Sequence, residues 1–156
     1  MSVAFRRDSD EEHKEPRFEL PIPPGRNLVT ARGLAAIEGR VAGLEADIAA
    51  ALDDAAREGL RRELRYWQTR RVTAEIAPPP AAGEAGIGSR VTIRLAGKLR
   101  DVEIVGGDEG DAALGRVPFA APLAQALIGA AVGERVDFNG VADGLEVVAI
   151  AAVGDR

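Results

Sequence analysis

Residues 30–80 read TARGLAAIEGRVAGLEADIAAALDDAAREGLRRELRYWQTRRVTAEIAPPP, and they carry the strongest periodicity in the chain. Apolar side chains recur there every three or four residues, which is typical of helices that pack along one shared seam. We predict one helix over Thr30–Leu52, with Thr30 as its N-cap, and a second over Ala55–Ala77. Prolines 78–80 would end the second helix, because proline lacks the backbone N–H that a helix interior needs. The predicted seam residues are Leu34, Ile37, Val41, Leu44, Ile48 and Leu52 in the first helix, and Leu60, Leu64, Trp67, Val72 and Ile76 in the second.

The two predicted helices have equal lengths and are separated only by Asp53 and Asp54. A short polar turn between equal helices predicts an antiparallel coiled-coil hairpin, because every seam residue then faces a partner. Asp54 is suited to cap the second helix, and such a cap contributes about 1 kcal/mol in any tight helical hairpin. Four glycines, at positions 33, 39, 43 and 59, weaken both helices. We therefore expect this two-helix arm to need a docking domain or a partner.

The hydrophobic period changes from helical to alternating after the proline- and glycine-rich residues 78–86. Val91–Leu95 and Val102–Ile104 alternate apolar with polar side chains, which predicts two half-buried strands joined by a tight turn. Asn139-Gly140 is a typical hairpin turn, although a longer loop also fits the sequence. The remaining predicted elements are strands over Gly115–Phe119, Arg135–Phe138 and Leu145–Ile150 and a short helix from Pro122 to Gly129.

The predicted fold class is α+β, with an N-terminal antiparallel α-helical coiled-coil hairpin and a C-terminal β-sheet domain that includes one short helix. We predict a disordered acidic and proline-rich tail over residues 1–27, the arm over 28–77, a linker over 78–86 and the C-terminal domain over 87–153. The tail mixes charges of both signs with few apolar side chains, so it cannot bury enough surface to become ordered.

The composition excludes several classes of site. The chain has 156 residues, no cysteine, a single histidine and a net charge of −5. The absence of cysteine excludes disulfides and thiolate metal sites. The single histidine, His13, lies within the predicted tail, which argues against a histidine-based triad. The acidic balance argues against a general nucleic-acid binder, and we expect no sequence-specific DNA binding. We see neither a membrane-spanning stretch nor a secretory signal, so we expect a cytoplasmic protein without membrane contact.

Four motifs occur in a consistent order along the chain. VTARGL opens the first predicted helix at residues 29–34, and IGSRVT, at residues 87–92, opens the C-terminal unit. IVGGDE follows at 104–109 and APLAQALIGAAVGE at 121–134. Together they resemble the GreA/GreB family of bacterial transcript cleavage factors, over residues 29–150.

The resemblance implies an FKBP-like C-terminal domain that docks on RNA polymerase at the rim of its secondary channel, while the coiled coil enters the channel. It assigns the polymerase-docking role to Pro122 and Leu123 and to Asp108 and Glu109. The factor would regulate transcription elongation by acting on the polymerase. It would have no catalytic residue, metal site or cofactor of its own.

The same resemblance assigns a role to the tip of the arm. In cleavage-competent relatives, acidic tip residues help to hold a second Mg²⁺ in the polymerase active site, next to the 3′ end of backtracked RNA. The tip candidates here are Asp53, Asp54 and Glu58. Arg57, Arg61 and Arg65 on the second helix are candidates for contact with nucleic acid. The alternative is that these arginines, together with Arg62, Arg70 and Arg71, form a solvated face balanced by glutamates.

The sequence also departs from the cleavage factors. Their tip contains an aspartate-leucine-serine-glutamate-asparagine-alanine run, whereas residues 53–59 read DDAAREG, and we expect a shorter arm. Shortened arms occur in Rnk-like relatives, which bind polymerase without stimulating cleavage. Ala120 and Ala121 stand before Pro122, where relatives often carry serine or aspartate. Cleavage stimulation, Rnk-like competition at the channel, an FKBP-type peptidyl-prolyl isomerase and a plain coiled-coil interaction module all remain open at this point.

Overall fold

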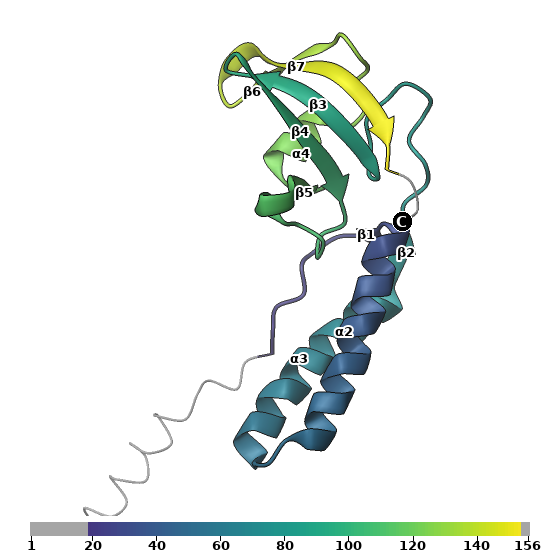
Figure 1. Cartoon of the computed structure of the whole chain (residues 1–156), viewed down its shortest axis with the longest axis vertical. Helices are drawn as coiled ribbons and strands as arrows, with labels where there is room; N and C mark the ends of the chain where they lie inside the picture. Colours follow the sequence, from purple (N-terminus) through teal and green to yellow (C-terminus); the bar gives the residue numbers. More distant parts are fainter. Residues whose placement is uncertain (1–18, 154–156) are drawn as a thin grey trace, which may run out of the picture.

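The computed structural model describes residues 19–153 and places a two-helix arm at one end of a sheet domain (Figure 1). In the arm, α2 spans Ala31–Ala50 and α3 spans Asp54–Thr73, each 20 residues long. At about 1.5 Å per residue each helix is about 30 Å long. The predicted α+β fold class and the antiparallel hairpin are confirmed. The predicted disorder of residues 1–18, and with it the environment of His13, lies outside the described residues.

The first half of the seam forms as predicted. Thr30 caps α2 by accepting a hydrogen bond from the backbone N–H of Gly33 at 3.0 Å. Ile37, Val41 and Leu44 are buried on the side of α2 that faces α3. The apolar side chains of α3 are only half-buried, since a two-helix hairpin covers each helix on one side.

Three predicted seam residues are not in the seam. Leu52 lies in the turn and is 98 % exposed, while Val72 and Ile76 are 78 % and 58 % exposed. α2 ends two residues before Leu52, and α3 ends at Thr73 rather than at Ala77. The spacing of the apolar residues changes between Trp67 and Val72, and the apolar stripe therefore leaves the interface between the helices.

Residues 74–76 were predicted as helix, but they form the strand β2 (Ala74–Ile76). This strand pairs in parallel with β1 (Asn27–Val29), which precedes α2 and lies at the same end of the arm. Val29 is 1 % exposed, and the Asn27 side chain donates to the backbone carbonyl of Arg70 at 2.8 Å. Pro78 disfavours helical geometry at the residue before it, and pairing with β1 supplies the backbone partners that a helix would have supplied. The tail boundary predicted at residue 27 thus falls inside a strand.

The C-terminal domain is built on the strands β3 (Ser89–Leu95), β4 (Lys98–Val105), β5 (Arg116–Pro118), β6 (Arg135–Phe138) and β7 (Val141–Ala152). They form one sheet with the order β5-β4-β3-β7-β6. β4 and β5 are parallel, and the other neighbours are antiparallel. Asn139 and Gly140 both have positive φ, at 55° and 80°, so the last hairpin turns in two residues and the longer-loop interpretation is wrong. The other elements of this domain are the 3₁₀ turn Ala112–Leu114 and the helix α4 (Pro122–Leu127).

The core of this domain lies between the sheet and α4. Alternate side chains of the three central strands point toward Ala124 and Leu127 of the helix, both of which are fully buried. Ala85, from the predicted linker, is also part of this core, and the neighbouring Glu84 pairs with Ala131. The buried strand residues are Val91, Ile93, Val102, Ile104, Leu145 and Val147.

Within residues 19–153, none of the helices combines the length and the apolar character that crossing a bilayer requires.

Candidate functional site

The tip of the arm carries two carboxylates with different surroundings. Asp53, not Asp54, is the N-cap of α3, and its side chain accepts from the N–H of Ala56 at 2.7 Å. The prediction that Asp54 is the cap is wrong because the helix begins one residue earlier. The Asp54 carboxylate is fully exposed and forms an ion pair with Arg57 at 2.8 Å. The cap thus occupies the Asp53 carboxylate, whereas that of Asp54 stays open to solvent.

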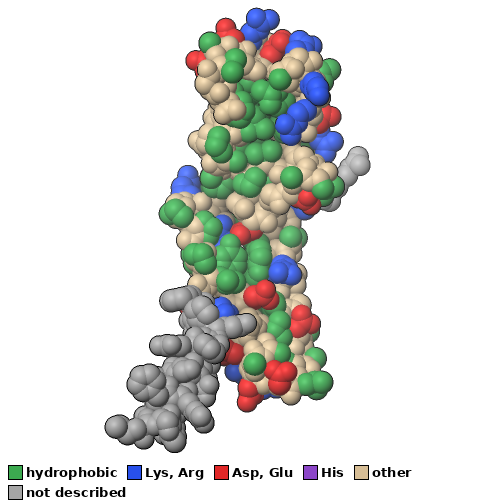
Figure 2. All heavy atoms as spheres, turned by 90° about the vertical axis from the view of Figure 1, so that its left-hand side faces the viewer, with side chains coloured by type: hydrophobic (Ala, Val, Ile, Leu, Met, Phe, Trp, Pro, Cys, Tyr) green, Lys and Arg blue, Asp and Glu red, His purple; other side chains and the backbone are tan. Residues whose placement is uncertain are grey.

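Arg57 also closes the turn itself. Ala51 is the first residue after α2, and the Arg57 guanidinium donates to its backbone carbonyl at 2.9 Å. Arg57 was predicted as a nucleic-acid contact, and in this structure it holds the turn together. Figure 2 shows acidic side chains gathered at the free end of the arm, where Asp47, Asp53 and Asp54 are exposed. Among residues 19–153, no group of three or more histidine, cysteine or acidic side chains is arranged to hold a metal ion.

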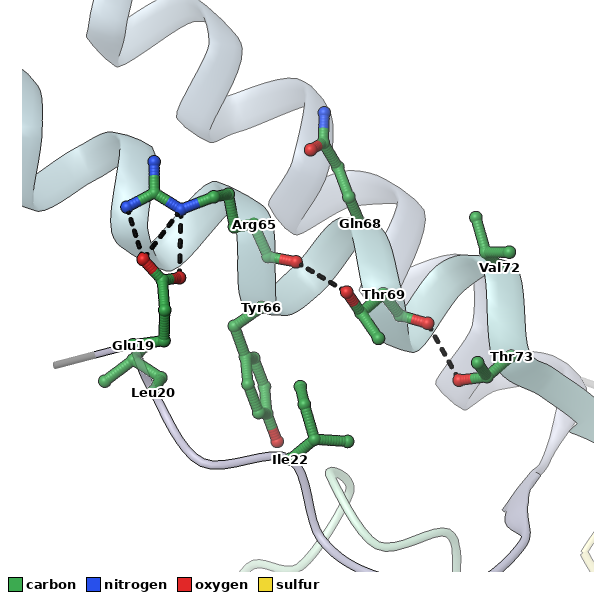
Figure 3. A pocket seen from close by; sticks show the side chains of 9 residues that line it. All are labelled: Glu19, Leu20, Ile22, Arg65, Tyr66, Gln68, Thr69, Val72 and Thr73. Carbon is green, nitrogen blue, oxygen red and sulfur yellow. Dashed lines mark hydrogen bonds and ion pairs between the residues drawn. The ribbon is translucent and has the colours of Figure 1, made fainter.

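The other predicted arginines lie further along α3. Arg61 is exposed, and Arg65 forms a two-pronged pair with Glu19, with Nε and Nη2 at 2.7 to 3.0 Å from the carboxylate oxygens (Figure 3). Glu58, the third tip candidate, lies one turn below the tip and reaches Arg65 at 3.4 Å. The hydrogen bonds with Arg65 lower the pKa of Glu19, and the same contacts raise the pKa of Arg65. No sequence pattern predicts the Glu19 contact, because Glu19 lies within the predicted tail.

The junction between the arm and the C-terminal domain centres on Asp108. Its carboxylate accepts from Arg70 Nε at 2.6 Å and from the Tyr66 hydroxyl at 2.6 Å. The Arg70 and Asp108 side chains are only 4 % and 9 % exposed. Burial, with the Asp108 carboxylate as the next contribution, raises the pKa of Tyr66 to about 12. The sequence placed Arg70 among the arginines of a solvated face, and the structure corrects this.

Glu109 lies on the other side of the same junction. Its carboxylate accepts from the backbone N–H and the hydroxyl of Thr30, and from the N–H of Gly106 at 2.8 Å. A β-carbon built on Gly33 would overlap this carboxylate, so glycine allows the close approach of α2. Asp108 and Glu109, which the resemblance assigned to polymerase docking, therefore face the chain's own arm. The geometry leaves them little carboxylate surface for an external partner.

A third junction carboxylate was missed by the sequence analysis. Glu103, on β4, alternates with apolar residues and was expected to face solvent, but it is 3 % exposed. It accepts from Arg32 of α2 at 2.8 Å and from Arg116 of β5 at 3.2 Å. Alternation reports the two faces of a strand but not what packs on the second face, so this burial could not be predicted.

The remaining docking candidates lie apart from this junction, on α4. Pro122 is exposed at the first turn of the helix, and Leu123 is partly buried against the core. Ala121 precedes the helix without a side-chain cap. An exposed proline beside apolar side chains is a surface that another protein can cover.

Two cavities also lie on the described part of the chain. One, of about 400 Å³, lies in the junction and is lined by Trp67 and Arg40, whose guanidinium sits 5.4 Å from the indole ring. Trp67, predicted as hairpin interior, thus also borders this cavity. The other, of about 590 Å³, lies between the β3–β4 and β6–β7 turns, and Phe138 is its single aromatic lining residue.

Comparison with known proteins gives the chain a family context. Residues 80–154 match the family model described as transcription elongation factor, GreA/GreB, C-terminal. None of the curated proteins matches the sequence.

Similar solved structures include GreA factor homolog 1 (Gfh1) of Thermus thermophilus, at 19 % identity and TM-score 0.39 over 82 % of this chain and 100 % of that one. Thermus aquaticus Gfh1 is similar at 19 % identity and TM-score 0.39, over 80 % and 97 % of the two chains. The elongation factor GreA/GreB from Nitrosomonas europaea is similar at 16 % identity and TM-score 0.37, over 81 % and 98 %.

The family match covers every strand of the five-stranded sheet together with α4, and it includes Pro122 and Leu123. Residues 80–154 therefore form a domain of the kind found at the C-terminus of the GreA/GreB transcription elongation factors.

Proposed function

We propose that the protein binds RNA polymerase at the rim of its secondary channel and modulates elongation, without stimulating cleavage of backtracked RNA. The observation that supports this most is a slender arm, about 30 Å long, fixed to a GreA/GreB C-terminal domain. The C-terminal domain would dock on the polymerase through Pro122 and Leu123. The arm would then enter the channel and approach the active site and the RNA 3′ end.

The carboxylates of the tip support the part of the proposal that concerns cleavage. A carboxylate that coordinates Mg²⁺ must offer free oxygen lone pairs toward the metal. Asp53 uses one oxygen to cap α3, and Arg57 partly neutralises Asp54. Glu58 points back along the helix to Arg65. A Mg²⁺ shared with the polymerase would therefore rely on Asp54 alone, and the factor would act by occupying the channel.

The docking claim is tested by co-elution of the purified protein with core RNA polymerase. Pro122→Asp places a charge on the proposed docking face at a helix position where aspartate is well tolerated, so the domain should still fold. We expect it to weaken binding at least about tenfold, because an unpaired charge in an interface is strongly unfavourable. Pro79→Asp, at an exposed proline of the linker, is the matched control and should bind like the unmodified protein. Equal binding of both variants would contradict docking through α4.

The cleavage claim is tested on a backtracked elongation complex with and without the protein. We expect the RNA 3′ end to stay uncut while the protein remains bound. Efficient cleavage that disappears in an Asp53→Ala/Asp54→Ala variant would show that the tip does complete the metal site.

A further inference from the structure

A short N-terminal segment, Glu19–Ile22, crosses the outer face of α3 (Figure 3). We call this segment the strap. Beyond its C-terminal end, β1 pairs with β2, and the Asn27 side chain donates to the backbone carbonyl of Arg70 and the hydroxyl of Thr73 in α3. Its first residue, Glu19, accepts hydrogen bonds from the guanidinium of Arg65. The strap thus places an acidic side chain of the tail on a basic residue of the arm.

Apolar contacts accompany the ion pair. Leu20 and Ile22 are 39 % and 45 % exposed, so each buries more than half of its surface. With Tyr66 and Val72 of α3 they line a shallow cavity beneath the strap. The strap therefore rests on the helix through both charge and apolar surface.

The sequence of the strap favours this position. Pro21 within the strap, and prolines 23 and 24 directly after it, restrict the backbone, so less conformational freedom is lost when the strap lies along the helix. Pro21 also lacks an N–H group, so at that position the strap has no donor that needs a partner.

We propose that the strap is an internal competitor of RNA: the Glu19 carboxylate occupies Arg65 in the place of a phosphate of single-stranded RNA. This inference rests on the proposed function, because it takes Arg65 as one of the arginines that would meet extruded RNA. The charge of Arg62 also lowers the pKa of Glu19, by less than Arg65 does. Glu58 faces Arg65 as well, but at 3.4 Å and from the same helix.

The size of the effect follows from the exposure of the pair. Both side chains are about half exposed, and solvent and salt screen such a pair. The strap is then closed for roughly half to four-fifths of the time, and the apparent RNA affinity falls by the open fraction. Release of the strap should therefore tighten RNA binding about two- to fivefold.

The test uses the full chain without polymerase, so it is independent of the docking experiment. Binding of a short fluorescein-labelled oligouridine RNA is measured by anisotropy at constant salt. Glu19→Gln removes the competing carboxylate, and Leu20→Ser/Ile22→Ser loosens the strap without any change of charge. Glu45→Gln, at an exposed carboxylate of α2, is the matched control for net charge. Far-UV circular dichroism confirms that every variant is folded.

We expect both strap variants to bind RNA about two- to fivefold more tightly and Glu45→Gln to bind like the unmodified chain. In an Arg65→Gln background, Glu19→Gln should have no further effect. Equal gains from Glu19→Gln and Glu45→Gln would overturn the proposal, since general electrostatics would then explain both. A gain in Glu19→Gln that Leu20→Ser/Ile22→Ser does not share would overturn it for the same reason. If none of the variants binds RNA, the assignment of RNA as the competing partner is overturned, whatever the result of the polymerase experiment.

Discussion

The ion pair between Arg70 and Asp108 should hold the arm on the C-terminal domain, and Arg70→Gln tests this directly. The substitution leaves the Asp108 carboxylate 9 % exposed, with only the Tyr66 hydroxyl and no cation. Removing one partner of a buried pair commonly destabilises a protein by 3–5 kcal/mol, because the other charge stays buried and uncompensated. Asp108 lies at the edge of a junction that can admit water, so we expect about 3 kcal/mol. That is a large share of the 5–15 kcal/mol of net stability typical of a folded domain.

The neighbouring residue supplies the control. Arg71→Gln makes the same chemical change on the same helix, but Arg71 is exposed, and its loss should stay within about 0.5 kcal/mol. Urea unfolding is followed by the fluorescence of Trp67, the single tryptophan, and by far-UV circular dichroism. The two signals together show whether the arm and the C-terminal domain unfold as one unit.

A double-mutant cycle completes the test. Asp108→Asn should also destabilise the protein, and the double variant Arg70→Gln/Asp108→Asn should lose at least 1 kcal/mol less than the sum of the two. Equal unfolding free energies for Arg70→Gln and Arg71→Gln would refute the reasoning, because the pair would then contribute no more than a surface charge.

Three further outcomes are expected from the same geometry. Tyr66, the single tyrosine, should ionise near pH 12 in an absorbance titration, and Asp108→Asn should lower the pKa of Tyr66 toward the ordinary value. The pKa of Tyr66 is higher in the folded than in the unfolded chain. Its contribution to stability is therefore full below about pH 10 and falls between about pH 10 and 12. An unchanged titration in the variant would rule out the carboxylate as a cause. Gly33→Ala should destabilise the protein by about 1–3 kcal/mol, because the new β-carbon would overlap the Glu109 carboxylate. A β-carbon at Gly43 would meet no other atom within 4 Å in the described structure, so Gly43→Ala should stabilise the arm by up to about 1 kcal/mol. The two variants should therefore shift the thermal unfolding temperature in opposite directions. Asp53→Ala should cost the arm about 1 kcal/mol through loss of the N-cap, measured by urea unfolding, and a neutral result would mean that the cap is not needed.

The junction has a consequence for the proposed function. Three carboxylates of the C-terminal domain are used to hold the base of α2 and α3, and all of them come from β4 or the loop that follows it. The direction of the arm is thereby fixed relative to α4, which carries the proposed docking residues. If α4 sets the position of the factor on the polymerase, the junction sets where the tip points, so variants at the junction should alter channel entry without altering docking.

Much of the arm and the sheet could be read from local sequence patterns. The helical period gave Ile37, Val41 and Leu44 as buried, and the alternating period gave the central strands of the sheet. These patterns succeed because they report which face of one element is apolar, and a contiguous apolar face is buried wherever a partner exists. The Gre-like motifs near α4 were likewise visible without any structure.

Only the tertiary structure decided which polar residues are buried and which charges meet. Arg70, Glu103 and Asp108 look like surface residues in the sequence, and each is buried because an element distant in the chain packs on it. β1 and β2 could not be foreseen either, since three-residue strands carry almost no pattern and exist only through each other. Local periodicity fixes the faces of helices and strands, whereas burial of a charge depends on long-range partners that no local pattern records.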